Sequence, residues 1–162
     1  MAALLGADDA EPAKPAAAKT YRKAAVIHFE GPITPWLEGY FTRKLAAAKA
    51  AGADLVVIEV DSPGGYVDES GNMAEMLRDA SWAHTVAYVP DEALSGAAFV
   101  SLGCDEIVMR PTARLGDVGM IFLDQDFMFR YAPEKYRSDL VQRVRGLATA
   151  KGRPPALAEA MV

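Results

Sequence analysis

The sequence predicts one α/β domain in which strand–helix units repeat around a mainly parallel sheet. Asp54–Val60 (DLVVIEV) is an almost continuous apolar, β-branched run, as expected of a parallel strand covered on both faces. A helical pattern over 68–80 separates it from the next apolar run, Thr85–Val89, which makes a strand–helix–strand unit that we expect to be right-handed. The same alternation precedes and follows this unit and specifies the α/β class. At 162 residues the chain suits one domain with a real core.

Composition excludes several classes of protein. Half of the residues, 51%, are hydrophobic and 24% are charged, which is typical of a soluble globular chain. The net charge of −5 argues against a nucleic-acid partner, and we interpret the locally basic stretch 130–153 as a solvated helix face. Cys104 is the single cysteine, so we expect neither a disulfide nor a cysteine-based metal site. No stretch approaches the roughly 20 apolar residues of a membrane span.

The two ends differ from the middle of the chain. Residues 1–22 are rich in Ala, Pro and Lys and are predicted to be a disordered linker or the remnant of a targeting segment. Ala156–Val162 is predicted to be helical and stops without a cap or a closing turn. We therefore expect a folded domain over 23–162 and a chain that is a fragment of a longer gene product.

The first half supplies a strand and a helix before the unit described above. Ala24–Phe29 is a short apolar run and is predicted to be a buried strand, with His28 as a packed core residue. Thr34 followed by proline predicts an N-cap with proline in the first turn. The helix is expected over 35–51, and Gly52 ends it as the C′ residue.

The second half continues the alternation with shorter elements. A helix after Leu94 is expected to end near Gly103, and Glu106–Met109 is predicted to be a short strand. Residues 111–119 are rich in turn formers. Asp126–Tyr131 (DFMFRY) is aromatic and suits packing under a loop or against a partner subunit. A helix is predicted over 133–150.

Ser95 is the first candidate for chemistry. It follows a strand, has small neighbours on its C-terminal side and precedes a predicted helix. The free N–H groups of that helix would point at the serine oxygen, and Gly96 offers an unobstructed amide. Acyl-transfer enzymes present a nucleophile beside an oxyanion hole in this way. The alternative is that Ser95 is only a helix N-cap, for which serine is a preferred residue.

The loop Asp61–Gly65 (DSPGG) is expected at the same edge, beyond the carboxyl end of a neighbouring parallel strand. An oxyanion could be held between an amide of Gly64 or Gly65 and that of Gly96. The alternative is a tight turn that needs glycine for positive φ. Ser62 is a weaker nucleophile candidate, because proline follows it and no helix lies behind it.

A nucleophilic serine needs a base. His28 and His84 both precede Ser95, and His84 is expected at the N-terminal end of its strand, away from the site. A lysine must be partly desolvated to lose its proton near neutral pH. Lys135 is in the first turn of a helix, after an aromatic segment that could shield it, and the helix N-terminus disfavours the ammonium form. Lys151 is flanked by small residues at a helix end and is expected to be solvent-exposed, so Lys135 is preferred.

Several motifs occur together in the order of a known superfamily. They are GPIT at 31–34, DSPGG at 61–65, LSGAAFV at 94–100, CDEIVMRPTARLGDVG at 104–119 and the segment opening KYRSDLVQRV at 135. This order resembles the ClpP/crotonase superfamily, and within it most closely SppA and the NfeD-type membrane-associated serine proteases. The resemblance covers Lys23 to the last residue and implies a ClpP/crotonase-like fold.

The resemblance implies a role for each matching residue. Ser95 would be the nucleophile and Lys135 the general base of a Ser-Lys dyad, and the amides of Gly65 and Gly96 would form the oxyanion hole. It implies a serine endopeptidase that cleaves apolar peptides or membrane-protein segments, without a metal or an organic cofactor, as a homo-oligomer. NfeD-type proteins usually continue into membrane spans, so the resemblance also implies a membrane-associated or extracytoplasmic location, with a membrane partner through segments that this chain lacks. Asp117 stands where the superfamily more often has a small residue.

Two other functions share the same fold. A crotonase-like acyl-CoA enzyme would use the same oxyanion geometry, with acidic residues near the site and a surface for adenine. A non-catalytic scaffold would keep the fold as an assembly module.

Overall fold

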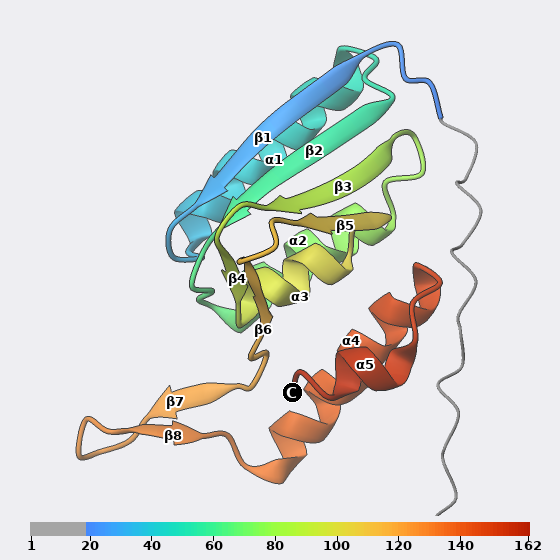
Figure 1. Ribbon diagram of the computed structural model, residues 1–162. Coiled ribbons are helices and arrows are strands. Elements are labelled where there is room, and N and C mark those ends of the chain that lie inside the picture. The colour runs from blue at the N-terminus through green and yellow to red at the C-terminus, as the bar shows by residue number, and fades with distance from the viewer. Residues whose placement is uncertain (1–18) are drawn as a thin grey trace, which may run out of the picture.

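The computed structural model describes residues 19–162, so most of the expected linker at 1–22 lies outside the described residues. The elements are β1 (Ala24–Glu30), α1 (Pro35–Ala50), β2 (Leu55–Asp61), α2 (Val67–Arg78), β3 (His84–Val89), β4 (Glu92–Leu94), α3 (Gly96–Leu102), β5 (Glu106–Met109), β6 (Arg114–Gly116), β7 (Ile121–Leu123), β8 (Phe129–Tyr131), α4 (Glu134–Ala150) and α5 (Pro155–Glu159). Figure 1 shows their arrangement.

The central sheet has four parallel strands in the order β1–β2–β3–β5. Ala24 pairs with Leu55 and Leu55 with His84, so three of the strands start in register and their carboxyl ends meet at one edge. The short strand β4 follows β3 directly but leaves the sheet and pairs in parallel with β6. The predicted α/β class with a mainly parallel sheet is confirmed.

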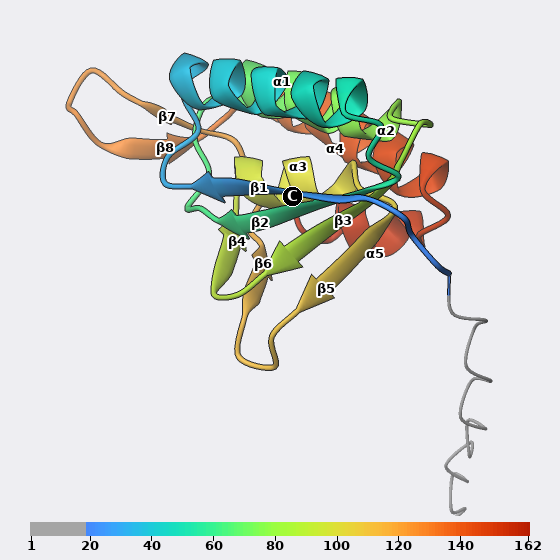
Figure 2. The ribbon, with the colours of Figure 1, turned by 90° about the horizontal axis from the view of Figure 1, so that it is seen from above.

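Only one face of this sheet is covered within residues 19–162. Helices α1 and α2 lie on the same side of it (Figure 2). Side chains in β2 and β3 alternate between buried and half-exposed, and Val26 in β1 is 56% exposed. The expectation that the strand at 54–60 is covered on both faces is therefore wrong. The apolar run is continuous because residues that face the open side of the sheet, such as Val57, are apolar as well.

Two apolar cores meet at α3. The first lies between the sheet and helices α1 and α2, and it includes Phe41, Ile58 and Met73. The second lies among α3, α4 and α5 and includes Phe99 and Val144. All seven residues of α3 are buried, because one side of this helix faces each core. The helix that follows Ser95 is thus fixed from two directions.

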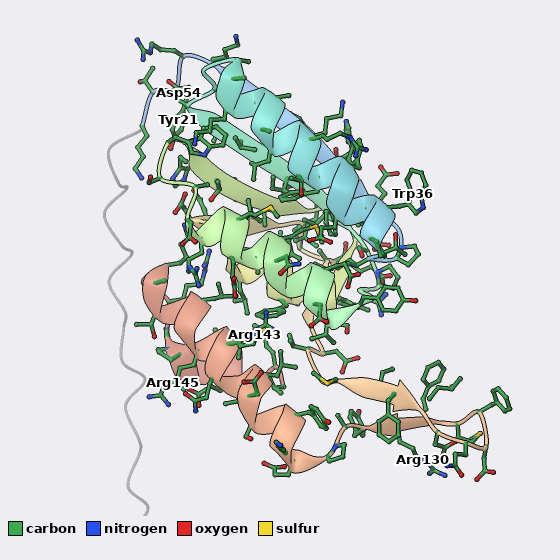
Figure 3. The ribbon with its side chains drawn as sticks, turned by 180° about the vertical axis from the view of Figure 1, so that it is seen from behind. Tyr21, Trp36, Asp54, Arg130, Arg143 and Arg145 are labelled. Atoms are coloured by element: carbon green, nitrogen blue, oxygen red, sulfur yellow. The ribbon has the colours of Figure 1, made fainter. Side chains whose placement is uncertain are left out.

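The first turns of α1 show what local sequence can and cannot specify. Thr34 is the N-cap, and its hydroxyl accepts a hydrogen bond from the Leu37 N–H at 3.4 Å, as predicted. Phe41 is fully buried, whereas Trp36 is 85% exposed and points away from the body (Figure 3). An aromatic side chain in the first turn of a helix thus need not face the core.

The hairpin β7–β8 leaves the body and leads back to α4 (Figure 1). Its large side chains are exposed, and Phe127 and Phe129 are 82% and 71% exposed. Helix α4 packs on the second core through its later turns, whereas residues 134–139 are all exposed. In the part of the chain that the structure describes, no helix combines the length and the apolar character needed to cross a membrane.

Replacing Gly103 by alanine should destabilise the fold, because the new methyl group would overlap the backbone of Ala74 in α2. A backbone obstacle cannot rotate away, so we expect a loss of about 1–3 kcal/mol in the free energy of unfolding. Gly146 lies on the exposed side of α4 with no atom near its added methyl group, and Gly146→Ala should gain about 0.5–1 kcal/mol. Urea denaturation of both variants measures the two free energies of unfolding, and equal stabilities would contradict the close packing of α2 on α3.

Candidate active site

The loop after β2 is joined to β4 by backbone pairing. The Ser62 N–H donates to the Glu92 carbonyl, and the Leu94 N–H donates to the Ser62 carbonyl, both at 3.0 Å. The Ser62 hydroxyl donates to the Gly31 carbonyl at 2.7 Å and accepts the Gly64 N–H at 3.1 Å. Ser62 is fully buried, so its hydroxyl holds the loop in place and is not presented to a substrate.

Gly64 makes the closest approach between the two candidate motifs. A Cβ at this position would lie 2.6 Å from the Cβ of Ser95 and 2.8 Å from the Gly96 nitrogen, which no side chain could tolerate. Its φ of +92° also lies in the region that favours glycine. The loop and the start of α3 are therefore in direct backbone contact, as expected of two segments at one sheet edge.

Ser95 adopts a backbone conformation that is rare for a residue with a side chain. Its φ is 52° and its ψ is −121°, and such a conformation costs of order 1–3 kcal/mol. The Ser95 N–H donates to the Gly116 carbonyl at 2.8 Å, which helps to hold this strained turn. Ser95 is the N-cap residue of α3 by position, but its hydroxyl makes no capping hydrogen bond. The interpretation of Ser95 as an ordinary helix cap is therefore wrong.

The three glycines proposed for an oxyanion hole are not equivalent. The Gly64 N–H is used by Ser62. Within residues 19–162, the N–H groups of Gly65 and Gly96 donate no hydrogen bond. They lie on either side of the contact between Gly64 and Ser95. Two free amides beside a strained serine can stabilise a negatively charged oxygen.

Ser95 opens into a small cavity of about 50 Å³. Its lining combines the glycine loop, the starts of α2 and α3 and two later segments, and is formed by Gly65, Val67, Ser70, Ser95, Gly96, Phe99, Val118, Gly119, Met120, Ile121 and Leu140. A second cavity of about 560 Å³ shares Gly119 and Met120 with it. The small cavity is mostly apolar, apart from the backbone and two serine hydroxyls.

Sequence reasoning missed Ser70. This residue is fully buried in α2, and its hydroxyl donates to the Tyr66 carbonyl at 2.6 Å. A Cβ on Gly96 would collide with that hydroxyl, so Ser70 sets how closely α2 approaches the start of α3. Nothing in the local pattern distinguishes it from a surface serine, because the contact joins two helices.

The structure does not bring Lys135 to Ser95. Lys135 is exposed and lines neither cavity, and among the residues described the one side-chain hydrogen bond at this residue runs from the Ser138 hydroxyl to its backbone carbonyl. It lies five positions before the buried Leu140, and steps of about 100° per residue place it roughly 140° around α4 from Leu140. Tyr131 and its aromatic neighbours are exposed as well, so the expected shielding of Lys135 is absent here.

Lys151 is buried, which corrects the expectation that it is solvent-exposed. Its side chain is 8% exposed, and its ammonium lies 2.7 Å from Asp105. Burial alone would raise the pKa of Asp105, but hydrogen bonds from Lys151 and Thr85 outweigh it and hold the pKa below its usual value. Lys151 is therefore committed to an ion pair at the C-terminal end of α3, away from Ser95.

Neither histidine contacts Ser95. His84 is the first residue of β3, at the opposite end of the strand, where it stacks on Tyr21 and lies 3.4 Å from Glu106. His28 is 62% exposed by side chain and pairs with Glu59 at 2.8 Å on the open face of the sheet. The prediction for His84 is confirmed, and the prediction of His28 as a core residue is wrong because β1 has one open face. No group of three or more candidate metal ligands occurs between residues 19 and 162.

The sheet, the glycine loop and the strained serine at the start of a buried helix define an NfeD-type domain with a ClpP-like protease fold. Residues 23–162 match the family described as NfeD1b, N-terminal domain, and the chain belongs to this family. The resemblance noted in the sequence is thereby confirmed.

Two curated relatives match most of this chain. Membrane protein NfeD1b of Bacillus subtilis is 30% identical over 136 residues, which are 84% of this chain and 30% of the relative. Membrane-bound protease PH1510 of Pyrococcus horikoshii is 27% identical over 140 residues, which are 85% of this chain and 32% of the relative. The chain thus spans about a third of the length of these relatives.

Solved structures agree with the fold. A lysine-to-alanine variant of the 1510-N membrane-bound stomatin-specific protease, in complex with a substrate peptide, has a TM-score of 0.80 at 26% identity and covers 86% of this chain and 65% of that chain. A serine-to-alanine variant of the same protease has a TM-score of 0.81 at 24% identity, covering 89% and 71%. ClpP1 from Listeria monocytogenes has a TM-score of 0.64 at 15% identity, covering 84% and 77%.

Replacing Ser95 by glycine should stabilise the domain relative to Ser95→Ala. Glycine adopts a φ of 52° without strain, whereas alanine keeps the strain of a Cβ. After the entropy that glycine loses on folding, we expect a difference of about 1 kcal/mol in the free energy of unfolding. Chemical denaturation measures it, and a less stable glycine variant would show that the turn at Ser95 is unstrained.

Replacing Asp105 by asparagine should destabilise the domain in a pH-dependent way. The folded-state pKa of Asp105 is lowered, so its contribution is present above the unfolded pKa of about 3.9 and is lost as the pH falls through the folded value. We expect a loss of about 1–2 kcal/mol at pH 7, less than for a fully buried pair because Asp105 is partly exposed, and a difference that shrinks as the pH falls below about 3.9. Denaturation across pH checks this, and a constant difference would refute the ion pair.

Proposed function

We propose that the domain is a serine endopeptidase with Ser95 as its nucleophile. The observation that carries the proposal is the strained turn at Ser95, whose hydroxyl caps nothing and which touches a glycine loop where the Gly65 amide, like that of Gly96, donates no hydrogen bond within residues 19–162. Strain of this kind persists only where the surrounding structure imposes it, and it is concentrated at functional sites. Structural serines at helix starts normally use their hydroxyl as a cap.

The chemistry follows from this geometry. The Ser95 oxygen attacks a peptide carbonyl, and the carbonyl oxygen becomes an oxyanion between the amides of Gly65 and Gly96. The amine leaves with a proton and an acyl-enzyme remains on Ser95. Water then attacks the ester, and the same amides stabilise the second oxyanion. Neither step requires a metal or an organic cofactor.

Lys135 is proposed as the general base. It requires a change in the first turn of α4, because the lysine now lies on the far side of the helix from Leu140. The exposure of residues 134–139 supports this, since rewinding them disrupts no buried contact. The related protease was solved with a serine replaced and with a lysine replaced, and these two residues are separated along their chain by almost the same number of positions as Ser95 and Lys135.

The proposed substrate is an apolar peptide segment. Phe99, Val118, Met120, Ile121 and Leu140 make the lining beside Ser95 apolar. The related structure holds a substrate peptide, and that protease is described as stomatin-specific. Both curated relatives are described as membrane proteins, which supports a membrane-associated role for the whole protein. The exposed apolar hairpin β7–β8 supports a homo-oligomer in which a second copy covers it.

A non-catalytic peptide-binding module is the second candidate. The orientation of Lys135 favours it, because a serine without a base can bind a peptide at the same amides without cleaving it. Nothing in the cavity beside Ser95 favours an acyl-CoA substrate, since its lining contains no acidic side chain.

Labelling with a fluorophosphonate probe should separate the two candidates. The parent chain should be labelled, Ser95→Ala should not, and Lys135→Ala should be labelled at least a hundredfold more slowly, as expected for loss of a general base. Lys49→Ala, an exposed lysine on α1, serves as the control and should label like the parent. Equal labelling of Ser95→Ala would refute the nucleophile. Equal labelling of Lys135→Ala would refute the base, and an unlabelled, folded parent would favour the binding module.

A further inference from the structure

The C-terminal end of α4 is held by hydrogen bonds that the proposed reaction does not use. The Lys151 ammonium donates to Asp105 Oδ1 at 2.7 Å and to the Leu77 carbonyl at 3.3 Å. Asp105 Oδ2 in turn accepts the backbone N–H and the hydroxyl of Thr85, at 2.8 and 2.9 Å. One cation therefore ties α4 to the end of α2, to the loop after α3 and to β3.

Arg153 adds a second tie at the same place. Its guanidinium donates to the carbonyls of Leu102 and Cys104, at 3.1 and 2.8 Å. Leu102 is the last residue of α3, so its carbonyl has no partner within the helix, and Cys104 lies two positions beyond it. Both cations thus lie at the negative ends of helix dipoles, which adds to their attraction. We call Lys151, Asp105 and Arg153 the clamp.

The clamp connects the two helices on which the candidate residues lie, α3 after Ser95 and α4 with Lys135. Helices α3 and α4 both end at the clamp, and α3 begins at Ser95. Leu140 on α4 lines the cavity that contains Ser95, and Lys135 lies about 7 Å further along the helix axis. A slip of α4 by one turn is about 5.4 Å. In one direction it would carry Lys135 beyond the site, and in the other it would bury the start of α4 against the hairpin.

Apolar packing and the clamp fix this register together. Leu140, Val144 and Leu147 face the second core, and a slip of one turn would place Arg143 or Lys151 at the position of Leu147. Hydrophobic attraction is non-directional, whereas hydrogen bonds to charged groups are directional and stronger, so the clamp opposes the smaller shifts that the core alone would tolerate.

We propose that Lys151 and Arg153 are positioning residues for the reaction at Ser95, because they hold the body of α4 in the register from which its first turn presents Lys135. This inference rests on the proposed function of Lys135. In this arrangement the body of α4 stays fixed, and only residues 134–139 rewind to bring the lysine to the serine. Figure 3 shows that Arg143, further along α4, points towards α2, whereas Arg145 points away.

Cross-linking tests the register without requiring activity. Cysteines introduced by Ser95→Cys and Lys135→Cys would be joined by a short bis-maleimide. The native Cys104 does not compete, because burial raises the pKa of its thiol to about 12. Adding Lys151→Met should lower the cross-linked fraction at least fivefold, and Arg153→Gln should act in the same direction if Lys151→Met fails to fold. Arg145→Met, which removes only a surface ion pair with Glu159, should leave it unchanged. An unchanged yield in a folded Lys151→Met protein would overturn the proposal.

Kinetics test the consequence for the reaction. With active sites titrated, Lys151→Met should lower kcat for an apolar peptide about tenfold while changing KM less than twofold, and Lys151→Arg should recover part of kcat. If the role of Lys151 were purely structural, the variant would have a lower concentration of titratable active sites and an unchanged kcat. That result would contradict positioning. Should Lys135→Ala label like the parent, the proposed base fails, and the cross-linking result still decides whether the clamp sets the register.

Discussion

The contact between Gly64 and the backbone around Ser95 is the constraint on which the candidate site depends. It joins the loop after β2 to the start of α3, and Ser62 fixes it through two backbone pairs and two bonds to its hydroxyl. The two backbones touch, the amides of Gly65 and Gly96 belong to the residues that follow this contact in each segment, and Ser95 has a positive φ beside it. A side chain at Gly64 would separate these groups, so one glycine makes the whole arrangement possible.

The candidate site combines a tightly packed part around α3 with a loosely packed part at the hairpin β7–β8 and the first turn of α4, and the fold explains the difference. Helix α3 is buried between two cores, which allows the strain at Ser95 to be maintained. The hairpin β7–β8 and the first turn of α4 carry exposed side chains and few buried contacts, so this region opens at low cost in free energy. The clamp at the other end of α4 confines that freedom to the first turn. Under the proposed function, the nucleophile would be held rigidly and the base would arrive by local rearrangement.

Much of the fold followed from local patterns. The β2 run, the Thr34 cap and the helix boundaries were predictable, because each depends on residues that are close in sequence. The errors share one cause: they concern which side of an element another element covers. His28 was assigned to the core and is exposed, and Lys151 was assigned to solvent and is buried. Periodicity shows that a face is apolar but not whether a partner is present on it.

The sequence by itself determined the chemistry available to this protein: a serine and three glycines at one sheet edge, histidines elsewhere, and lysines after the serine. Only the tertiary structure decided how these groups are used. The strain at Ser95 comes from a backbone contact with a loop thirty positions away, and the separate roles of Gly64 and Gly65 come from one hydroxyl of Ser62. The position of Lys135 depends on the rotation and register of α4, which are set by packing against α2 and α3. Such long-range contacts leave no periodic trace in the sequence, because their partners are specified by shape and not by spacing.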